Sequence, residues 1–195
     1  MPLSEDAALQ MDPDIDKFSY LISISEKVVM EAHQEGCYSA TYFRYPFVYG
    51  PRGLAPMEWS IMRRILDGRR ALIVPDGGLG LRARGYAQNM AHAVLLAIDQ
   101  PEKSAGKCYN VADERCLSHR EWITLIAQAM KWEWELVSIP YRLARPSRAY
   151  ARGAQHYMLD ITRIKEELGY RDAVPVEEAV RRTVEWWQEH RPEPG

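Results

Sequence analysis

The feature that most constrains the fold is the regular alternation of helix-type and strand-type segments along the chain. Segments with apolar residues at helical spacing alternate with short runs rich in β-branched and aromatic residues. Alternation of this kind favours an α/β fold with parallel pairing of the strands. The predicted helices cover residues 20–35, 59–66, 91–98, 119–130, 161–168 and 176–188, and the predicted strands cover residues 39–44, 71–74, 107–111 and 134–139.

Charge and composition exclude several classes of function. The 195 residues carry 25 Lys and Arg against 27 Asp and Glu, a formal net charge of -2 at pH 7. That balance gives no general attraction for nucleic acid or for an anionic membrane. The acidic start MPLSEDAALQ is typical of neither a signal peptide nor a membrane span. We therefore expect a cytoplasmic protein that binds a small-molecule substrate and neither nucleic acid nor a membrane.

The cysteines and histidines are scattered along the chain. Cys37, Cys108 and Cys116 are widely spaced and form no CxxC pair, and the five histidines form no HExxH motif. A disulfide framework or a structural zinc site is therefore not expected. We predict no metal site.

Five motifs occur in a fixed order along the chain. They are RYPFVYGPR at residues 44–52, RARGYAQNMAHA at 82–93, GKCYNVAD at 106–113, DITRIKEELGY at 160–170, and an amphipathic stretch at 176–187 that ends in Trp. Together they resemble the C-terminal portion of the extended short-chain dehydrogenases/reductases of the NAD-dependent epimerase/dehydratase family. The corresponding family patterns are R-P-x-x-V-Y-G-P-R, R-x-F-x-Y-V-D-D-V-A-x-A, G-x-x-Y-N-V-x-D, D-x-x-K-x-x-x-x-L-G-Y and a closing helix. Each motif alone is a weak signal, whereas five in this order are specific.

The resemblance implies a partial Rossmann-like parallel sheet together with the small α/β substrate-binding subdomain of these enzymes. Residues 1–17 would then be a loop, residues 18–54 a remnant of the Rossmann-like part, and residues 55–195 mainly the substrate-binding subdomain with returning Rossmann strands. We expect residues 145–153 to be irregular.

The resemblance also implies that a cofactor-binding part is missing. Family members begin with a strand and a G-x-x-G-x-x-G turn, which holds the cofactor pyrophosphate at a helix N-terminus. Nothing before residue 18 matches that turn, so we expect the N-terminal half to be absent. NAD or NADP is the cofactor of the full-length family, and we do not expect this chain alone to bind it. The protein partner would be the missing half or a second copy of the chain.

The proton-transferring pair of the family has the pattern Y-x-x-x-K, in which the lysine lowers the pKa of the tyrosine. No register of the first predicted helix keeps both residues. Tyr20 is the candidate catalytic residue, and the alternative is a half-buried aromatic on the helix face. The three registers pair Phe18 with Ile22, Tyr20 with Ile24, and Ser23 with Lys27.

Cofactor contacts are implied at Tyr45, Pro46 and Phe47, because ligands of open α/β sheets bind at the carboxyl ends of the strands. Family members often carry Asn where Phe47 stands. Phe47 can offer only stacking or shape, and packing in the core is the alternative.

Substrate contacts are implied at Arg82, Arg84 and Asn89. Arg82 corresponds to the family arginine that contacts the phosphates of a nucleotide sugar, a task that suits the paired donors of a guanidinium. Arg84 is the neighbouring candidate, and the alternative is a solvent-facing arginine beside a turn. Gln88 and Asn89 replace an Asp-Asp pair of the family, and we expect them to cap the next helix.

Two functions remain open from the sequence. The first is an NAD(P)-dependent epimerase, dehydratase or reductase that acts on a nucleotide sugar or a similar small polar substrate, here truncated and inactive alone. The second is a non-catalytic binding or regulatory protein of the same fold. Residues 78–83 also fit G-x-G-x-x-A, a second possible nucleotide turn, although a turn before the arginine motif explains these glycines more simply.

Overall fold

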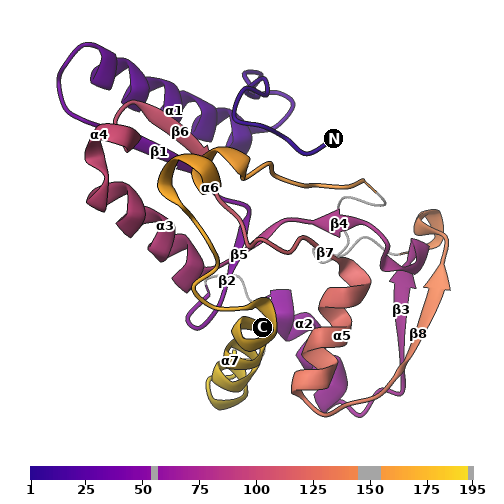
Figure 1. The fold of residues 1–195 in the computed structure, drawn as a ribbon. Coiled ribbons are helices and arrows are strands. Elements are labelled where there is room, and N and C mark those ends of the chain that lie inside the picture. Colours follow the sequence, from indigo (N-terminus) through magenta and orange to yellow (C-terminus); the bar gives the residue numbers. More distant parts are fainter. Residues whose placement is uncertain (54–56, 145–154, 193–195) are drawn as a thin grey trace.

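The computed structural model describes residues 1–53, 57–144 and 155–192, and the predicted irregular stretch 145–153 lies outside them. Helices and strands alternate along most of the chain (Figure 1). The helices are α1 (Lys17–Gln34), α2 (Met57–Leu66), α3 (Ala87–Asp99), α4 (Pro101–Ser104), α5 (His119–Ala129), α6 (Thr162–Leu168) and α7 (Val176–Glu189), with short 3-10 turns at Asp76–Gly78 and Tyr141–Leu143. The strands are β1 (Thr41–Arg44), β2 (Phe47–Tyr49), β3 (Ala71–Pro75), β4 (Leu81–Arg82), β5 (Arg84–Tyr86), β6 (Lys107–Asn110), β7 (Leu117–Ser118) and β8 (Glu135–Ile139).

The four predicted strands are confirmed as β1, β3, β6 and β8, and all six predicted helices are present. Helix α1 begins three residues before the predicted start because Asp16 caps it. One carboxylate oxygen of Asp16 accepts hydrogen bonds from the backbone N–H groups of Phe18 and Ser19, at 3.0 and 3.2 Å. Strands β2, β4, β5 and β7 were not predicted, because two or three residues are too few to carry a strand pattern.

Parallel pairing joins strands that lie far apart in the sequence. Strand β1 pairs with β6, β2 with β5, and β3 with β8, all in parallel. Only β4 and β7 pair in the antiparallel direction among the named strands of the described residues. The predicted α/β class with parallel pairing is therefore confirmed.

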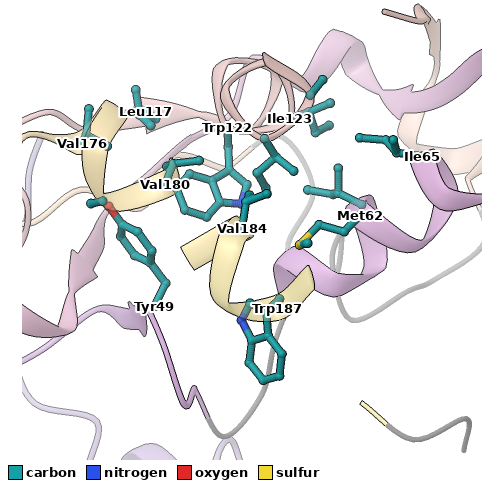
Figure 2. Packing of buried hydrophobic residues seen from close by; sticks show 14 of the residues in the cluster. Tyr49, Met62, Ile65, Leu117, Trp122, Ile123, Val176, Val180, Val184 and Trp187 are labelled. Carbon is teal, nitrogen blue, oxygen red and sulfur yellow. The ribbon is translucent and has the colours of Figure 1, made fainter. Parts of the chain in front are cut away.

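Two hydrophobic clusters hold these elements together. The larger one lies where α2, α5 and α7 meet beside β3 and β8, and Figure 2 shows Trp122, Ile123, Val180 and Val184 at its centre. The smaller one joins α3, β6 and α6, with Tyr109 and Ile164 fully buried. On α7, Trp187 is buried in the larger cluster, and Trp186 packs against the edge of that cluster and stacks on His190 with ring centroids 4.3 Å apart.

Helix α5 starts at a capping box. The hydroxyl of Ser118 accepts a hydrogen bond from the backbone N–H of Glu121 at 3.1 Å, and the Glu121 carboxylate accepts one from the backbone N–H of Ser118 at 2.8 Å. The start of α3 differs from our prediction. Neither Gln88 nor Asn89 caps it; a carboxylate oxygen of Asp113 accepts from the Tyr86 N–H instead, at 2.9 Å.

Candidate functional site

A hollow lies where β2, β4 and β5 face the first turns of α2 and α5. The space in it that water-sized molecules can occupy is about 30 Å³, and the hollow opens to solvent. Three of the predicted site residues, Phe47, Arg82 and Arg84, line this hollow together. The remaining lining residues are Met57, Ile61, His119 and Trp122.

Strand pairing brings the predicted residues together. In the parallel pair of β2 and β5, Phe47 lies opposite Arg84. In the antiparallel pair of β4 and β7, Arg82 lies opposite Leu117, directly before the residue that caps α5. Residues more than thirty positions apart in the sequence therefore share one wall.

Arg84 is a buried cation, with 9% of its surface exposed. Its Nη1 donates to the backbone carbonyl oxygens of Arg82 and Leu117, at 3.1 and 3.3 Å. Its guanidinium carbon lies 4.5 Å from the ring centroid of Trp122, a cation–π contact. Burial lowers the pKa of Arg84 to about 10, so the side chain remains charged at neutral pH.

No ion pair compensates Arg84 among the described residues. Among the nearby charges, Glu58 on α2 favours the charged form of Arg84 most strongly, but no ion pair joins the two in the described part of the chain. Glu58 is 2% exposed, and its Oε1 has no hydrogen-bond partner. Burial raises the pKa of this carboxyl to about 7.

His119 contributes a neutral imidazole to the hollow. Burial lowers the pKa of His119 to about 4, and the positive charges of Arg84 and Arg82 add to this effect. At neutral pH the cations Arg82 and Arg84 therefore face the hollow together with a neutral histidine and aromatic rings.

Asn89 does not line the hollow, and its side-chain amide makes hydrogen bonds to other residues of the protein. It is 0% exposed, and its Nδ2 donates to an Asp113 carboxylate oxygen at 2.9 Å and to the Val174 carbonyl at 3.1 Å. Its Oδ1 accepts from the Val174 N–H at 2.9 Å. The side chain thus ties α3 to the segment before α7, and its predicted contact with substrate stays a prediction.

A match to one protein-family model decides the family. The model of the NAD dependent epimerase/dehydratase family matches residues 16–112. Residues 16–112 belong to the NAD dependent epimerase/dehydratase family. This confirms the resemblance drawn from the sequence motifs.

Curated relatives of this family cover the chain more widely. A dTDP-glucose 4,6-dehydratase of Streptomyces griseus is 32% identical over 146 residues, which are 73% of this chain and 41% of the relative. UDP-glucuronate 4-epimerase 5 of Arabidopsis thaliana is 26% identical over 163 residues, which are 76% of this chain and 36% of the relative. The chain thus spans about two fifths of the length of these curated relatives.

Solved structures of the family share the fold. A UDP-glucose 4-epimerase of Thermotoga maritima, solved with UDP-glucose, is 26% identical with a TM-score of 0.67, and the match covers 88% of this chain and 53% of that one. A UDP-glucuronic acid 4-epimerase of Bacillus cereus, solved with NAD, has a TM-score of 0.74 at 17% identity, over 97% of this chain and 57% of that one. The second likeness concerns the fold alone, which is the Rossmann-like fold of the extended short-chain dehydrogenases.

The remaining predicted residues lie apart from the hollow lining. Tyr20 is half-buried on α1, and Phe18, at its start, is 72% exposed. Tyr45 and Pro46 form the link between β1 and β2, where Tyr45 stacks on Phe43 with ring centroids 6.0 Å apart. Burial raises the pKa of Tyr45. Their roles in proton transfer and cofactor contact stay predictions.

The described residues do not offer a cradle for the NAD pyrophosphate of this family. The glycines at 77 and 78 lie in a 3-10 turn that leads into β4 and not into a helix. A Cβ on Gly78 would lie 2.6 Å from Cγ1 of Val74, so the missing side chain lets two chain segments pack and leaves no room for a phosphate. The second possible nucleotide turn, at residues 78–83, therefore has the wrong surroundings.

Sequence reasoning missed Glu58, His119 and Trp122. The capping box at Ser118 predicted where α5 starts, and His119 and Trp122 lie on its first turn. No sequence signal indicated that this turn would face the arginine motif. Glu58 gave no signal either, because an acid beside a predicted helix start is usually exposed.

Metal-binding and membrane-spanning geometry are both absent from the described ranges. These ranges contain no group of three or more His, Cys, Asp or Glu side chains placed to hold a metal ion. None of the helices in them is long and apolar enough to cross a membrane.

Proposed function

We propose that this chain is the substrate-binding portion of an NAD(P)-dependent epimerase or dehydratase, and that the hollow binds the diphosphate of a nucleotide sugar. The observation that carries the proposal is the buried guanidinium of Arg84, which has no carboxylate partner among the described residues and lies beside Arg82 on the wall of the hollow. A buried charge is costly unless a counter-ion meets it. A bound phosphate oxygen would supply that counter-ion.

The chemistry of the wall fits such a ligand. Arg82 would donate charge-assisted hydrogen bonds to a phosphate, while Arg84 would supply positive potential and its remaining donors. Phe47 and Trp122 would pack against the less polar parts of the ligand. The relatives named above are a dTDP-glucose dehydratase and UDP-sugar epimerases, which supports a nucleotide sugar as the substrate class.

The finer points belong to the same proposal. We expect a small-molecule partner, a cytoplasmic location, and dependence on further residues, or on a second copy, for turnover. The α1 helix supplies no Tyr–Lys pair in any register, which favours binding without turnover by this chain alone. That is the second candidate function, a binding protein of the same fold.

The test is binding of UDP-glucose to the purified chain, measured by isothermal titration calorimetry. Arg82→Ala removes charge-assisted hydrogen bonds worth about 1.5–3 kcal/mol, so we expect the affinity to fall about tenfold to a hundredfold. Arg63→Ala is the matched control, because Arg63 is an exposed arginine on α2 that does not line the hollow. Equal affinities of the two variants would contradict the proposal.

A further inference from the structure

Glu58 is a buried acid with no assigned role. It lies on the first turn of α2, next to Met57 and three residues before Ile61, both of which line the hollow. Its exposed fraction is 2%, and Oε1 has no hydrogen-bond partner. A carboxyl group held in this way is costly when ionised, unless a cation lies near.

The cation near Glu58 is Arg84. It is the only charged group that acts on the Glu58 carboxyl among the described residues, and it favours the ionised form. Arg84 in turn has Nη1 hydrogen bonds to backbone carbonyls only. The charge of Arg84 thus favours ionisation of Glu58, although no ion pair joins the two among the described residues.

An anion in the hollow would meet the same cation. Arg84 lines the hollow, so a bound phosphate or sulfate would approach its guanidinium from the open side. Two negative charges, the anion and an ionised Glu58, would then share one buried cation and repel each other. The repulsion is removed when Glu58 takes up a proton.

We propose that Glu58 determines the anion affinity of the hollow, by competing as an internal carboxylate for the charge of Arg84, so that anion binding is accompanied by uptake of a solvent proton in those molecules in which Glu58 was ionised. This rests on the proposed function, because it takes the hollow to be the anion site. Glu58 contacts neither phosphate nor sugar in this scheme and acts through Arg84.

The other ionisable groups around Arg84 leave Glu58 as the main candidate for the proton. His119 on α5 has a pKa of about 4, and burial raises the pKa of Cys116, before β7, and of Tyr49 on β2. Arg82 on β4 remains a cation. Asp113 also has a raised pKa, but its Oδ1 already accepts two hydrogen bonds, from Tyr86 and Asn89.

The first test is the pH dependence of sulfate binding. Sulfate stays a dianion from about pH 6 to about pH 8, so it brings no proton of its own. The sulfate affinity of the unaltered chain should fall up to about tenfold over this range, because Glu58 ionises within it. In Glu58→Gln the affinity should be independent of pH and equal to the low-pH affinity of the unaltered chain.

The matched control is Glu135→Gln, which neutralises an exposed acid on β8 and should keep the pH dependence of the unaltered chain. A pH slope that persists in Glu58→Gln would assign the proton to another group, Asp113 first, and would overturn the proposal. A flat profile in the unaltered chain would do the same.

A second measurement needs no variant. Calorimetric titration with sulfate at pH 7, in two buffers of different ionisation enthalpy, gives the number of protons taken up, and we expect about half a proton. No uptake would overturn the role of Glu58 while leaving the proposed function intact. No binding of sulfate or UDP-glucose at any pH would overturn both.

Discussion

At position 84 a guanidinium lies buried on the face of Trp122, with its charge uncompensated by any ion pair in the described ranges. The family pattern R-x-F, aligned on Arg82, has an aromatic residue here. In this chain the β5 residue is the cation Arg84, and the aromatic ring beside it is that of Trp122, which comes from α5. We infer that this exchange gives the hollow its positive potential, because a charge at low dielectric acts more strongly than one in water.

The same pair of residues predicts how stability depends on pH. The pKa of Glu58 is about 7 in the folded chain against an ordinary value of 4.5. Because the folded-state pKa is raised, the contribution of Glu58 to the free energy of unfolding is full below about pH 4.5 and is lost as the pH rises through 7. The loss is at most about 3 kcal/mol, since Glu58 is almost fully buried.

We expect Glu58→Gln to remove this share of the pH dependence. Urea unfolding at a series of pH values between about 4.5 and 8 should give a flatter stability curve for the variant than for the unaltered chain. The remaining slope is the balance of two opposed groups, because burial raises the pKa of Asp172 to about 6 and lowers that of His119 to about 4. Parallel curves for the two proteins would show that Glu58 does not titrate in this range.

At the scale of elements, short strands and one helix start form the hollow. Strands β2, β4, β5 and β7 contain two or three residues each, and their pairing is what places Phe47 opposite Arg84 and Arg82 beside α5. Helix α5 is fixed at its start by the Ser118–Glu121 capping box. His119 and Trp122 owe their positions in the hollow to that start.

Removing the cap should loosen α5 by a predictable amount. Ser118→Ala deletes the hydroxyl that accepts from the Glu121 N–H, and we expect the free energy of unfolding to fall by about 1 kcal/mol. Thr124→Ala is the control, because Thr124 is an exposed residue further along the same helix. Thermal unfolding of both variants measures the difference, and the prediction is wrong if they unfold at the same temperature.

At the scale of the whole molecule, the two hydrophobic clusters divide the described chain. One cluster joins β6, α3 and α6, and the other joins α2, α5 and α7 with β3 and β8. The division into a Rossmann-like remnant at residues 18–54 and a mainly substrate-binding part at residues 55–195 remains a prediction. The hollow lies beside the larger cluster, since its lining residues Ile61 and Trp122 belong to that cluster.

The chain should not hold a nicotinamide cofactor tightly by itself. The described residues provide no glycine turn between a strand and a helix that could cradle a pyrophosphate. Titration with NADH and with NADPH, followed by nicotinamide fluorescence, should therefore show no saturable binding at micromolar concentration. The UDP-glucuronic acid 4-epimerase of Bacillus cereus, which was solved with NAD, is a suitable positive control, and tight binding by the present chain would contradict the prediction.

The sequence by itself determined the fold class, the family, the longer helices and strands, and the capping box of α5. These follow from periodicity and from motifs, which are local properties of the chain. It also singled out Phe47, Arg82 and Arg84, although not their common location. The absence of an intact Tyr–Lys pair from the first predicted helix was also visible in the sequence, because it depends only on which residues stand four positions apart.

Only the tertiary structure decided which of these residues meet. Two-residue and three-residue strands carry no pattern of their own, so their pairing is fixed by long-range contacts that the sequence does not display. The burial of Glu58 and Asn89, and with it the raised pKa of Glu58, likewise arises from elements packed around them. Charge and solvation depend on three-dimensional surroundings, and for that reason the electrostatics of the hollow could not be read from the chain.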